Sequence, residues 1–361
     1  MNRRWICNDV WMDMFPCFDR PQLGLKLALL SPRFNALVDI HFDGKSELTI
    51  WRPIIIDKDK GPEPKLSVRF DDGFVPFPLP DRPLPSKIRF KRLQIMYIDH
   101  SVIAFLRLNH QIFDKRGTDL YLCIPSSHHI NEQQLIWDVL AREIWPIFSA
   151  NIRHLGFNND VDLDHLFRLI SPTIITGLNQ LNSIYSHDLL PEAIGDDFDV
   201  PNSTISAGQA LSKWLHSPRK DGQPKRLCCD DHNEQGNTNW VNNFKEHFLR
   251  ANAISSVSYQ IHFSIRVPSM EIVPFELENE WSKEKLTLAK ANENEWDNNW
   301  IMKRCKIGKT AAVHLKNENW DNCNNVFIWL NSHTNCIGPL SPPPEEVEQE
   351  AGQSITKGRN E

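Results

Sequence analysis

Residues 5–42 carry apolar side chains at helical spacing, and polar caps and prolines divide this stretch into three short segments. An Asn-Asp pair opens the first helix, which Pro16 is expected to end or kink. Asp19 and Ser31 are each followed by a proline within two residues, which is a start signal for a second and a third helix. The alternating leucines of LGLKLALL (23–30) also fit a strand, but the capping signals favour a helix that is buried on both sides.

These helices hold more apolar side chain than a bundle of their length can bury. Domains of fewer than about 40 residues rarely bury enough surface to fold alone. Part of the apolar surface must therefore pack on the rest of the chain or on another protein.

Residues 43–86 combine short β patterns with many prolines. The alternation of ELTIWRPIII (47–56) predicts a strand, and KLSVRFDDGFVPF (65–77) predicts a hairpin about Asp72-Gly73. The eight prolines between residues 53 and 85 stiffen the chain. We interpret this region as a semi-rigid spacer with a small β element.

Residues 87–337 alternate between strand-like and helix-like pieces, and the strands begin at intervals of roughly 30 residues. This order predicts parallel strands with right-handed crossovers, arranged as an irregular leucine-rich-repeat-like solenoid or as an open parallel sheet. The predicted strands are 87–96, 118–124, 151–157, 179–185, 224–229 and 256–265, and the predicted helices are 100–113, 131–148, 163–170, 207–215 and 239–249.

The last part of the chain is expected to close the edge of the α/β part. A hairpin over 273–291 and a helix near 295–304 fit the pattern there. Residues 338–361 are proline-rich and then acidic, which predicts disorder. The whole pattern therefore predicts an α+β protein, with an N-terminal three-helix module followed by α/β repeats.

Composition narrows the classes of function. The chain is 40% hydrophobic and 24% charged, which is ordinary for a globular protein. It has 40 basic and 46 acidic residues and a net charge of −6, so it lacks the excess of basic residues that is typical of nucleic-acid-binding proteins. No run reaches the roughly 18 apolar residues that a membrane span needs. Asp9 and Asp13 interrupt what would be the apolar part of a signal peptide, so we expect a cytoplasmic or nuclear protein with reduced cysteines.

Motifs of catalysis or metal binding do not stand out. Gly308-Lys309-Thr310 lacks the earlier glycine of a phosphate-binding loop, and no G-x-S-x-G nucleophile elbow occurs. Cys228 and Cys229 are adjacent, which disfavours their joint binding of one tetrahedral zinc, and no C-x-x-C pair completes a site. We expect no enzyme activity, no cofactor and no metal.

Nine of the twelve tryptophans fall into two groups. Those in helical patterns (Trp137, Trp145, Trp214, Trp240 and Trp300) are expected in the core. Those in polar surroundings (Trp281, Trp296, Trp320 and Trp329) either anchor a partner or cap the core.

Residues 6–39 resemble the F-box, the motif that docks substrate receptors onto the Skp-type adaptor of SCF-type cullin–RING ubiquitin ligases. LKLALLSPRFNALVD (25–39) matches the second half of the motif, and ICNDVWMDMFPCF (6–18) matches its opening helix. The sequence departs from the motif by having Ile6-Cys7 in place of Leu-Pro, Phe34 in place of a tryptophan, and one extra residue between the first two helices.

A second stretch, 274–308, is similar to the C-terminal part of lineage-expanded F-box families, in which a strand–turn–strand precedes a tryptophan-bearing helix and an Arg-Cys-x-Ile ending. The resemblance implies a substrate receptor that acts by proximity and leaves the protein substrate unidentified. The adaptor would contact, or the module's own core would contain, Ile6, Val10, Met14, Phe15, Leu25, Leu29, Leu30, Phe34 and Leu37. The alternative is a self-contained interaction or scaffold protein whose N-terminal helices cap its own core.

Overall fold

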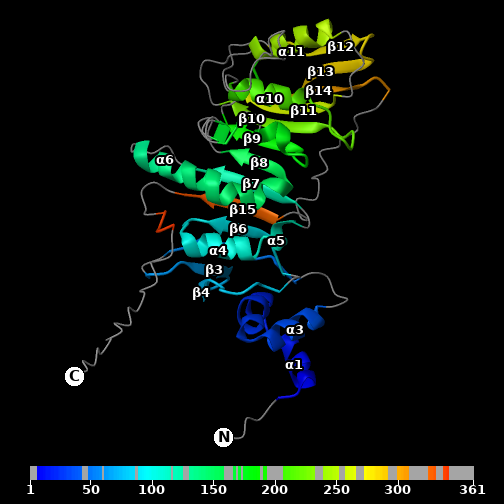
Figure 1. Ribbon diagram of the computed structural model, residues 1–361. Helices are drawn as coiled ribbons and strands as arrows, with labels where there is room; N and C mark the ends of the chain where they lie inside the picture. The colour runs from blue at the N-terminus through cyan, green and yellow to red at the C-terminus, as the bar shows by residue number, and fades with distance from the viewer. Residues whose placement is uncertain are drawn as a thin grey trace, which may run out of the picture.

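The computed structural model shows an N-terminal helical module at one end of a long, mostly parallel β-sheet that carries helices (Figure 1). The structure describes residues 6–42, 48–58, 61–85, 88–114, 117–124, 130–157, 166–167, 170–171, 174–187, 190–192, 206–231, 239–251, 257–265, 272–291, 299–308, 324–330 and 336–340. Most of residues 338–361 and of the predicted helix over 163–170 therefore lie outside the described part.

The N-terminal module consists of the expected helical segments. They are α1 (Asn8–Met14), η1 (Phe15–Cys17), α2 (Arg20–Gln22), η2 (Leu23–Leu27), η3 (Ala28–Leu30) and α3 (Pro32–His41). The hydroxyl of Ser31 caps α3 by accepting a hydrogen bond from the Phe34 N–H (3.3 Å). The six segments form three contiguous helical runs, and the stretch 23–30 is helical, so the strand alternative is wrong. Ser31 caps α3 as expected, whereas Cys7 and not the Asn8-Asp9 pair is the N-cap of α1 and makes no side-chain cap hydrogen bond.

One sheet of 13 strands spans the rest of the molecule. Its strands, in spatial order, are β12 (Phe275–Asn279), β13 (Glu284–Lys290), β14 (Asn299–Lys306), β11 (Tyr259–Ile265), β10 (Lys225–Asp231), β9 (Ser183–His187), β8 (Ile152–Phe157), β7 (Thr118–Cys123), β15 (Asn324–Trp329), β6 (Arg92–Ile95), β2 (Ile54–Asp57), β3 (Lys65–Phe70) and β4 (Gly73–Pro78). A separate parallel pair joins β1 (Leu48–Ile50) to β5 (Ile88–Phe90).

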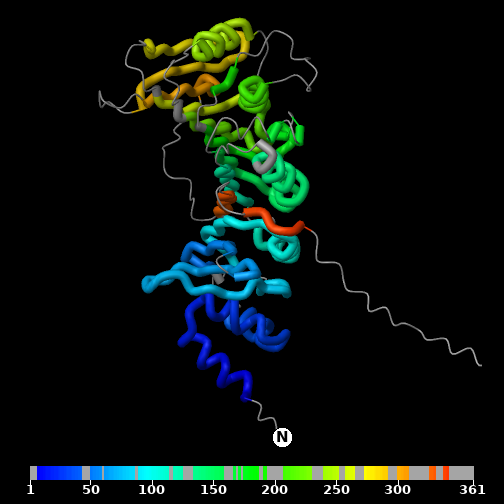
Figure 2. The backbone as a smooth tube through the Cα atoms, turned by 90° about the vertical axis from the view of Figure 1, so that its left-hand side faces the viewer, coloured from blue at the N-terminus to red at the C-terminus, as the bar shows by residue number. Residues whose placement is uncertain are grey.

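The middle of the sheet is parallel from β11 to β2, as the strand–helix alternation predicted. The helices between these strands lie on one side of the sheet (Figure 2). They include α4 (His100–Leu108), α5 (Gln111–Asp114), α6 (Ile130–Val139), η4 (Leu140–Ile144), α7 (Trp145–Phe148), η5 (Ser149–Asn151), α9 (Ile174–Gly177), α10 (Ala207–His216) and α11 (Asn239–Arg250). The mixed α/β class is thereby confirmed.

The chain returns to the middle of the sheet near its C-terminal end. Strand β15 lies between β6 and β7 and is parallel to both (Figure 1). Its Val326 and Ile328 are fully buried, so the strand completes the core between two elements that are close in sequence.

The two ends of the sheet differ from the parallel centre. Residues 43–86, where we expected a spacer with a small β element, contribute β2, β3 and β4 to one end of the main sheet. The predicted hairpin about Asp72-Gly73 is present there as β3 and β4, and Gly73 has a φ of 128° at the turn.

At the other end, the expected helix near 295–304 is wrong over its described residues. Residues 299–306 form β14, which is antiparallel to both β11 and β13. Trp300, Met302 and Arg304 are buried and their neighbours are more exposed, which is the alternation of a strand with one face covered. The expected hairpin over 273–291 is confirmed as β12 and β13.

The tryptophans that we expected in the core are buried. Trp137, Trp145, Trp214, Trp240 and Trp300 have exposed fractions between 0% and 7%. Trp281 is 75% exposed, which excludes it from the core, and Trp329 is half-exposed. Trp296 and Trp320 lie outside the described residues.

Candidate functional site

The first helix exposes a row of apolar side chains to solvent. Val10 and Met14 are four residues apart on α1, and Ile6 precedes Val10 by the same spacing. Their exposed fractions are 47% for Ile6, 47% for Val10 and 40% for Met14. Soluble proteins rarely leave an ordered apolar row uncovered without a binding role, so this face is the primary candidate for a protein-interaction site.

Arg33 fixes the orientation of this helix. Its Nε and Nη2 donate hydrogen bonds to Asn8 Oδ1 at 3.0 and 2.7 Å, and Nη2 also donates to the Ile6 carbonyl at 2.7 Å. These bonds hold the start of α3 against the start of α1. Leu30 lies three residues before Arg33 and is 60% exposed, so it belongs to the same end of the module.

The module has its own packed interior. Phe15, Leu25 and Leu37 are buried, so they are core residues that cannot contact a partner without unfolding the module. Trp11 packs edge-on against Phe34, with ring centroids 4.9 Å apart. Leu29 and Phe34 are half-buried against this core.

The helices also contact the sheet domain. Arg20 Nη1 donates to the Thr49 carbonyl at 3.2 Å, which ties α2 to β1. Figure 1 shows the module beyond β4, with α1 farther from the sheet than α3. The buried side chains of the module join the same apolar core as those of the sheet. The face on α1 therefore remains uncovered by the described residues even though the helices are docked.

The structure divides the nine predicted interface residues into three groups. Ile6, Val10, Met14 and Leu30 are exposed; Leu29 and Phe34 are half-buried; and Phe15, Leu25 and Leu37 are core. Ile40, near the end of α3, is a further exposed apolar side chain (57%) that was not among the predicted interface residues. Ile40 lies three residues after the buried Leu37 on α3, and a residue at that spacing can lie at the margin of a buried helix face. This spacing was the signal in the sequence that could have identified Ile40.

The cysteine pair that was considered for metal binding lies within a strand. Cys228 and Cys229 are consecutive residues of β10, Cys229 is buried, and successive strand side chains point to opposite faces. His232 lies outside the described residues. Within the described ranges, no group of three histidine, cysteine or acidic side chains is placed to hold a metal ion.

Two buried basic groups have shifted pKa values near the far end of the sheet. Burial, assisted by the charge of Arg304, lowers the pKa of His216 to about 3. Its Nδ1 lies 2.8 Å from the Ser212 carbonyl, which fits a neutral ring that donates from Nδ1. The ring packs beside Phe244 and Tyr259.

Lys225 is the second of these groups. Burial lowers the pKa of Lys225 to about 8, and its ammonium group donates to the Trp214 carbonyl and the Ser217 hydroxyl. Lys225 and His216 lie between the helices and the sheet, so we assign both to the packing of this end.

In the described part of the chain, no helix has the length and apolarity needed to cross a membrane. Comparison of the chain with protein-family models, with curated proteins and with solved structures finds no match.

Proposed function

We propose that this protein is an F-box substrate receptor that joins a Skp-type adaptor of a ubiquitin ligase to a protein target. The observation that carries the proposal is the exposed apolar row Ile6, Val10 and Met14, with Leu30 at the same end of the module. The proposal also rests on the resemblance of residues 6–39 to the F-box. A Val, Leu or Met side chain that moves from water into an interface contributes about 1.5–3 kcal/mol, so a few such residues suffice for a stable complex.

The proposed mechanism is proximity. The N-terminal module binds the adaptor, the α/β part holds the target, and partner subunits carry out ubiquitin transfer. Tethering raises the effective concentration of the target at the transferring enzyme, so this chain needs no catalytic group, cofactor or metal of its own. The proposed compartment is the cytoplasm or nucleus, where such ligases act.

The α/β part is suited to hold a target because it is long and carries its helices on one side of the sheet (Figure 2). We propose that it is an irregular leucine-rich-repeat-like solenoid. The strand order advances steadily from β7 to β11, as expected when each strand–helix unit stacks on the preceding one.

A second candidate function is a self-contained interaction or scaffold protein whose N-terminal helices cap its own core. The apolar core shared between module and sheet and the Arg20–Thr49 hydrogen bond favour it. This candidate predicts no adaptor binding, whereas the first candidate requires it.

Affinity purification of the tagged full chain followed by mass spectrometry separates the two candidates. The first candidate predicts co-purification of the adaptor and cullin, and loss of both with the double variant Val10→Asp, Leu30→Asp. The matched control is Leu135→Asp, Leu249→Asp, which changes two side chains of comparable exposure, 47% and 53%, outside the module. Recovery of the adaptor with the Val10/Leu30 variant at the wild-type level would contradict the proposed interface.

A further inference from the structure

The far edge of the sheet is formed by β12, at the end opposite to the helical module (Figure 1). Among the described residues, β12 pairs only with β13. Alternate N–H and C=O groups of such an edge strand point outward and can pair with another extended chain. The edge strand β4 at the other end differs, because Pro76 and Pro78 remove backbone donors there.

The two faces of β12 have different chemistry. Glu276 and Glu278 are exposed on one face, while Phe275 and Leu277 are half-buried on the other and pack against the core. Lys285 of β13 lies directly opposite Glu278 and forms an ion pair with Glu276, so this face of the hairpin carries two carboxylates and one ammonium group and keeps a net negative charge. The β12 edge therefore has one face with a net negative charge, which carries Glu276 and Glu278, and one apolar face, which carries Phe275 and Leu277.

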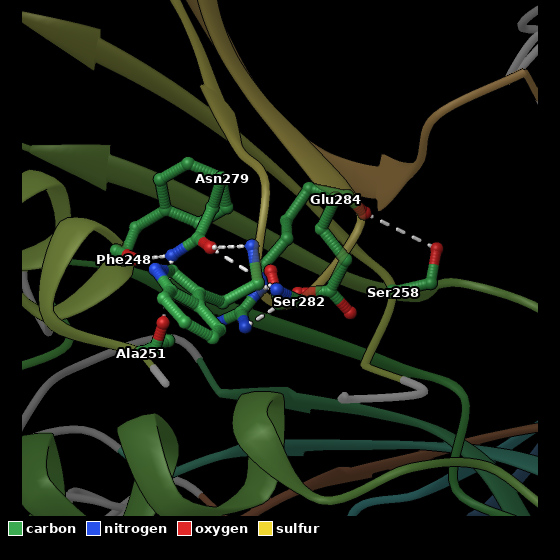
Figure 3. A network of polar contacts seen from close by, with 8 residues as sticks. Phe248, Ala251, Ser258, Asn279, Ser282 and Glu284 are labelled. Atoms are coloured by element: carbon green, nitrogen blue, oxygen red, sulfur yellow. Dashed lines mark hydrogen bonds and ion pairs between the residues drawn. The ribbon is translucent and has the colours of Figure 1, made fainter. Parts of the chain in front are cut away.

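The turn that follows β12 is held rigidly by Asn279. The buried amide donates from Nδ2 to the Phe248 and Ala251 carbonyls, at 2.8 and 2.9 Å, at the end of α11. Its Oδ1 accepts from the N–H groups of Trp281 and Ser282, at 2.9 and 3.1 Å (Figure 3). All four hydrogen-bonding positions of the amide are thus satisfied.

Trp281 projects from this fixed turn with 75% of its surface exposed. A large aromatic side chain on a rigid backbone loses little conformational freedom when it binds a partner. Aromatic side chains of this kind dominate the energetics of many interfaces. The turn therefore places an anchor at the end of a strand edge that no described strand covers.

We propose that the β12 edge binds an extended segment of the protein target as an added strand. Basic side chains at alternate positions of the segment lie beside Glu276 and Glu278, and the intervening apolar side chains lie beside Phe275 and Leu277. Trp281 covers the end of the bound segment. Cross-strand pairs of opposite charge stabilise such pairing, and a strand added to a sheet edge is a common mode of peptide recognition. This inference rests on the proposed function, because it assigns the target-binding part of the receptor.

Charged side chains on an edge strand also serve to prevent aggregation, and this alternative makes a different prediction. If the carboxylates only keep other strands away, a peptide with basic side chains at alternate positions should not bind to the edge through backbone hydrogen bonds. The test must therefore examine both the charge and the backbone pairing of a bound segment.

The experiment titrates the full chain into a fluorescein-labelled ten-residue peptide of alternating lysine and valine and measures fluorescence anisotropy. We expect saturable binding that weakens about tenfold in the variant Glu276→Lys, Glu278→Lys, because two attractive cross-strand pairs become repulsive. The control Glu246→Lys reverses an exposed carboxylate on α11 and should leave binding unchanged. Trp281→Ala should weaken binding as well, and a peptide of alternating glutamate and valine should not bind.

Two N-methylated peptides test the strand pairing. Methylation of every second backbone nitrogen removes the donors on one edge of the peptide, and methylation of the other set removes those on the opposite edge. We expect one of these peptides to lose binding and the other to retain it. Equal binding of both, no binding of the unmodified peptide, or wild-type binding by the Glu276/Glu278 variant would overturn the proposal.

The same variant also separates this inference from the proposed function. We expect the Glu276/Glu278 variant to co-purify the adaptor as the wild type does. Loss of peptide binding with retained adaptor supports both proposals. Retained adaptor with no peptide binding by the wild type overturns only the β12 site, and failure of the wild type to capture the adaptor contradicts the receptor function itself.

Discussion

Replacement of Arg304 by methionine tests what holds the β12 end of the sheet together. Arg304 of β14 donates from Nε and Nη2 to Glu284 Oε2 of β13, at 2.9 and 2.6 Å. The exposed fractions of the two side chains are 3% and 0%, respectively. The Arg304→Met variant leaves the Glu284 carboxylate buried without its cation.

The loss of stability expected for Arg304→Met follows from the two hydrogen bonds that are removed and from the burial of Glu284. A hydrogen bond to a charged group contributes about 1.5–3 kcal/mol, so two bonds give about 3–6 kcal/mol. This agrees with the cost of about 3–5 kcal/mol for removing one partner of a buried ion pair. Replacing both partners by apolar residues of similar size is often close to neutral. The double variant Glu284→Met, Arg304→Met should therefore be more stable than either single variant.

The assay is urea-induced unfolding of the full chain, followed by far-ultraviolet circular dichroism, for the wild type, both single variants and the double variant. The matched control is Arg250→Met, which removes a basic side chain from an exposed ion pair with Glu246 and should cost less than about 1 kcal/mol. Additive losses in the double variant, or a loss of less than about 1 kcal/mol for Arg304→Met, would refute the idea that the pair acts as a buried unit.

Three further predictions concern the module, the buried histidine and the sheet centre. Leu37→Ala should destabilise the chain by about 2–5 kcal/mol and Leu30→Ala by less than about 0.5 kcal/mol, measured by urea unfolding, because only Leu37 is buried. The folded-state pKa of His216 is about 3 and its ordinary value is 6.5, so its contribution to stability is present above pH 6.5 and is lost as the pH falls. The loss of this contribution should lower the free energy of unfolding by about 2 kcal/mol between pH 7 and pH 5. The variant His216→Gln should lack this pH-dependent loss. Gly156→Ala would bring the new Cβ into collision with the Tyr121 ring, which stacks on Phe327 of β15, and should cost about 1–3 kcal/mol in the same unfolding assay. Its control is Gly177→Ala, which should be tolerated because no atom lies within 4 Å of the new Cβ.

The N-terminal helices were predictable because their signals are local. A cap hydroxyl at Ser31, a proline in the first helical turn and a proline at residue 16 act through bonds within a few residues. The same holds for the parallel strands and the helices between them, since their hydrophobic periods differ.

Two features of the fold depend on contacts far apart in sequence. The place of β15 between β6 and β7 is set by side chains over 200 residues away, and nothing within β15 specifies its neighbours. The resemblance to lineage-expanded F-box families predicts a tryptophan-bearing helix where β14 lies, whereas pairing with β11 and β13 decides the conformation of this segment.

The candidate site was predictable as a region but not residue by residue. Every apolar side chain of the module fits both a core and an interface role until the helices are placed. The hydrogen bonds of Arg33 and the contact of α2 with β1 determine which residues face inward. They leave Ile6, Val10 and Met14 outside while Leu37 is enclosed.

The most direct test of the proposed receptor function is isothermal titration of the purified full chain with a purified Skp-type adaptor. We expect one-to-one binding with a Kd of about 1 µM or tighter, and a loss of affinity of about a hundredfold or more for Val10→Asp, Leu30→Asp in a chain that unfolds at the wild-type urea concentration. Absence of measurable heat with the wild-type chain, or equal affinity of the variant, would contradict the claim that the exposed face of α1 is the adaptor-binding surface.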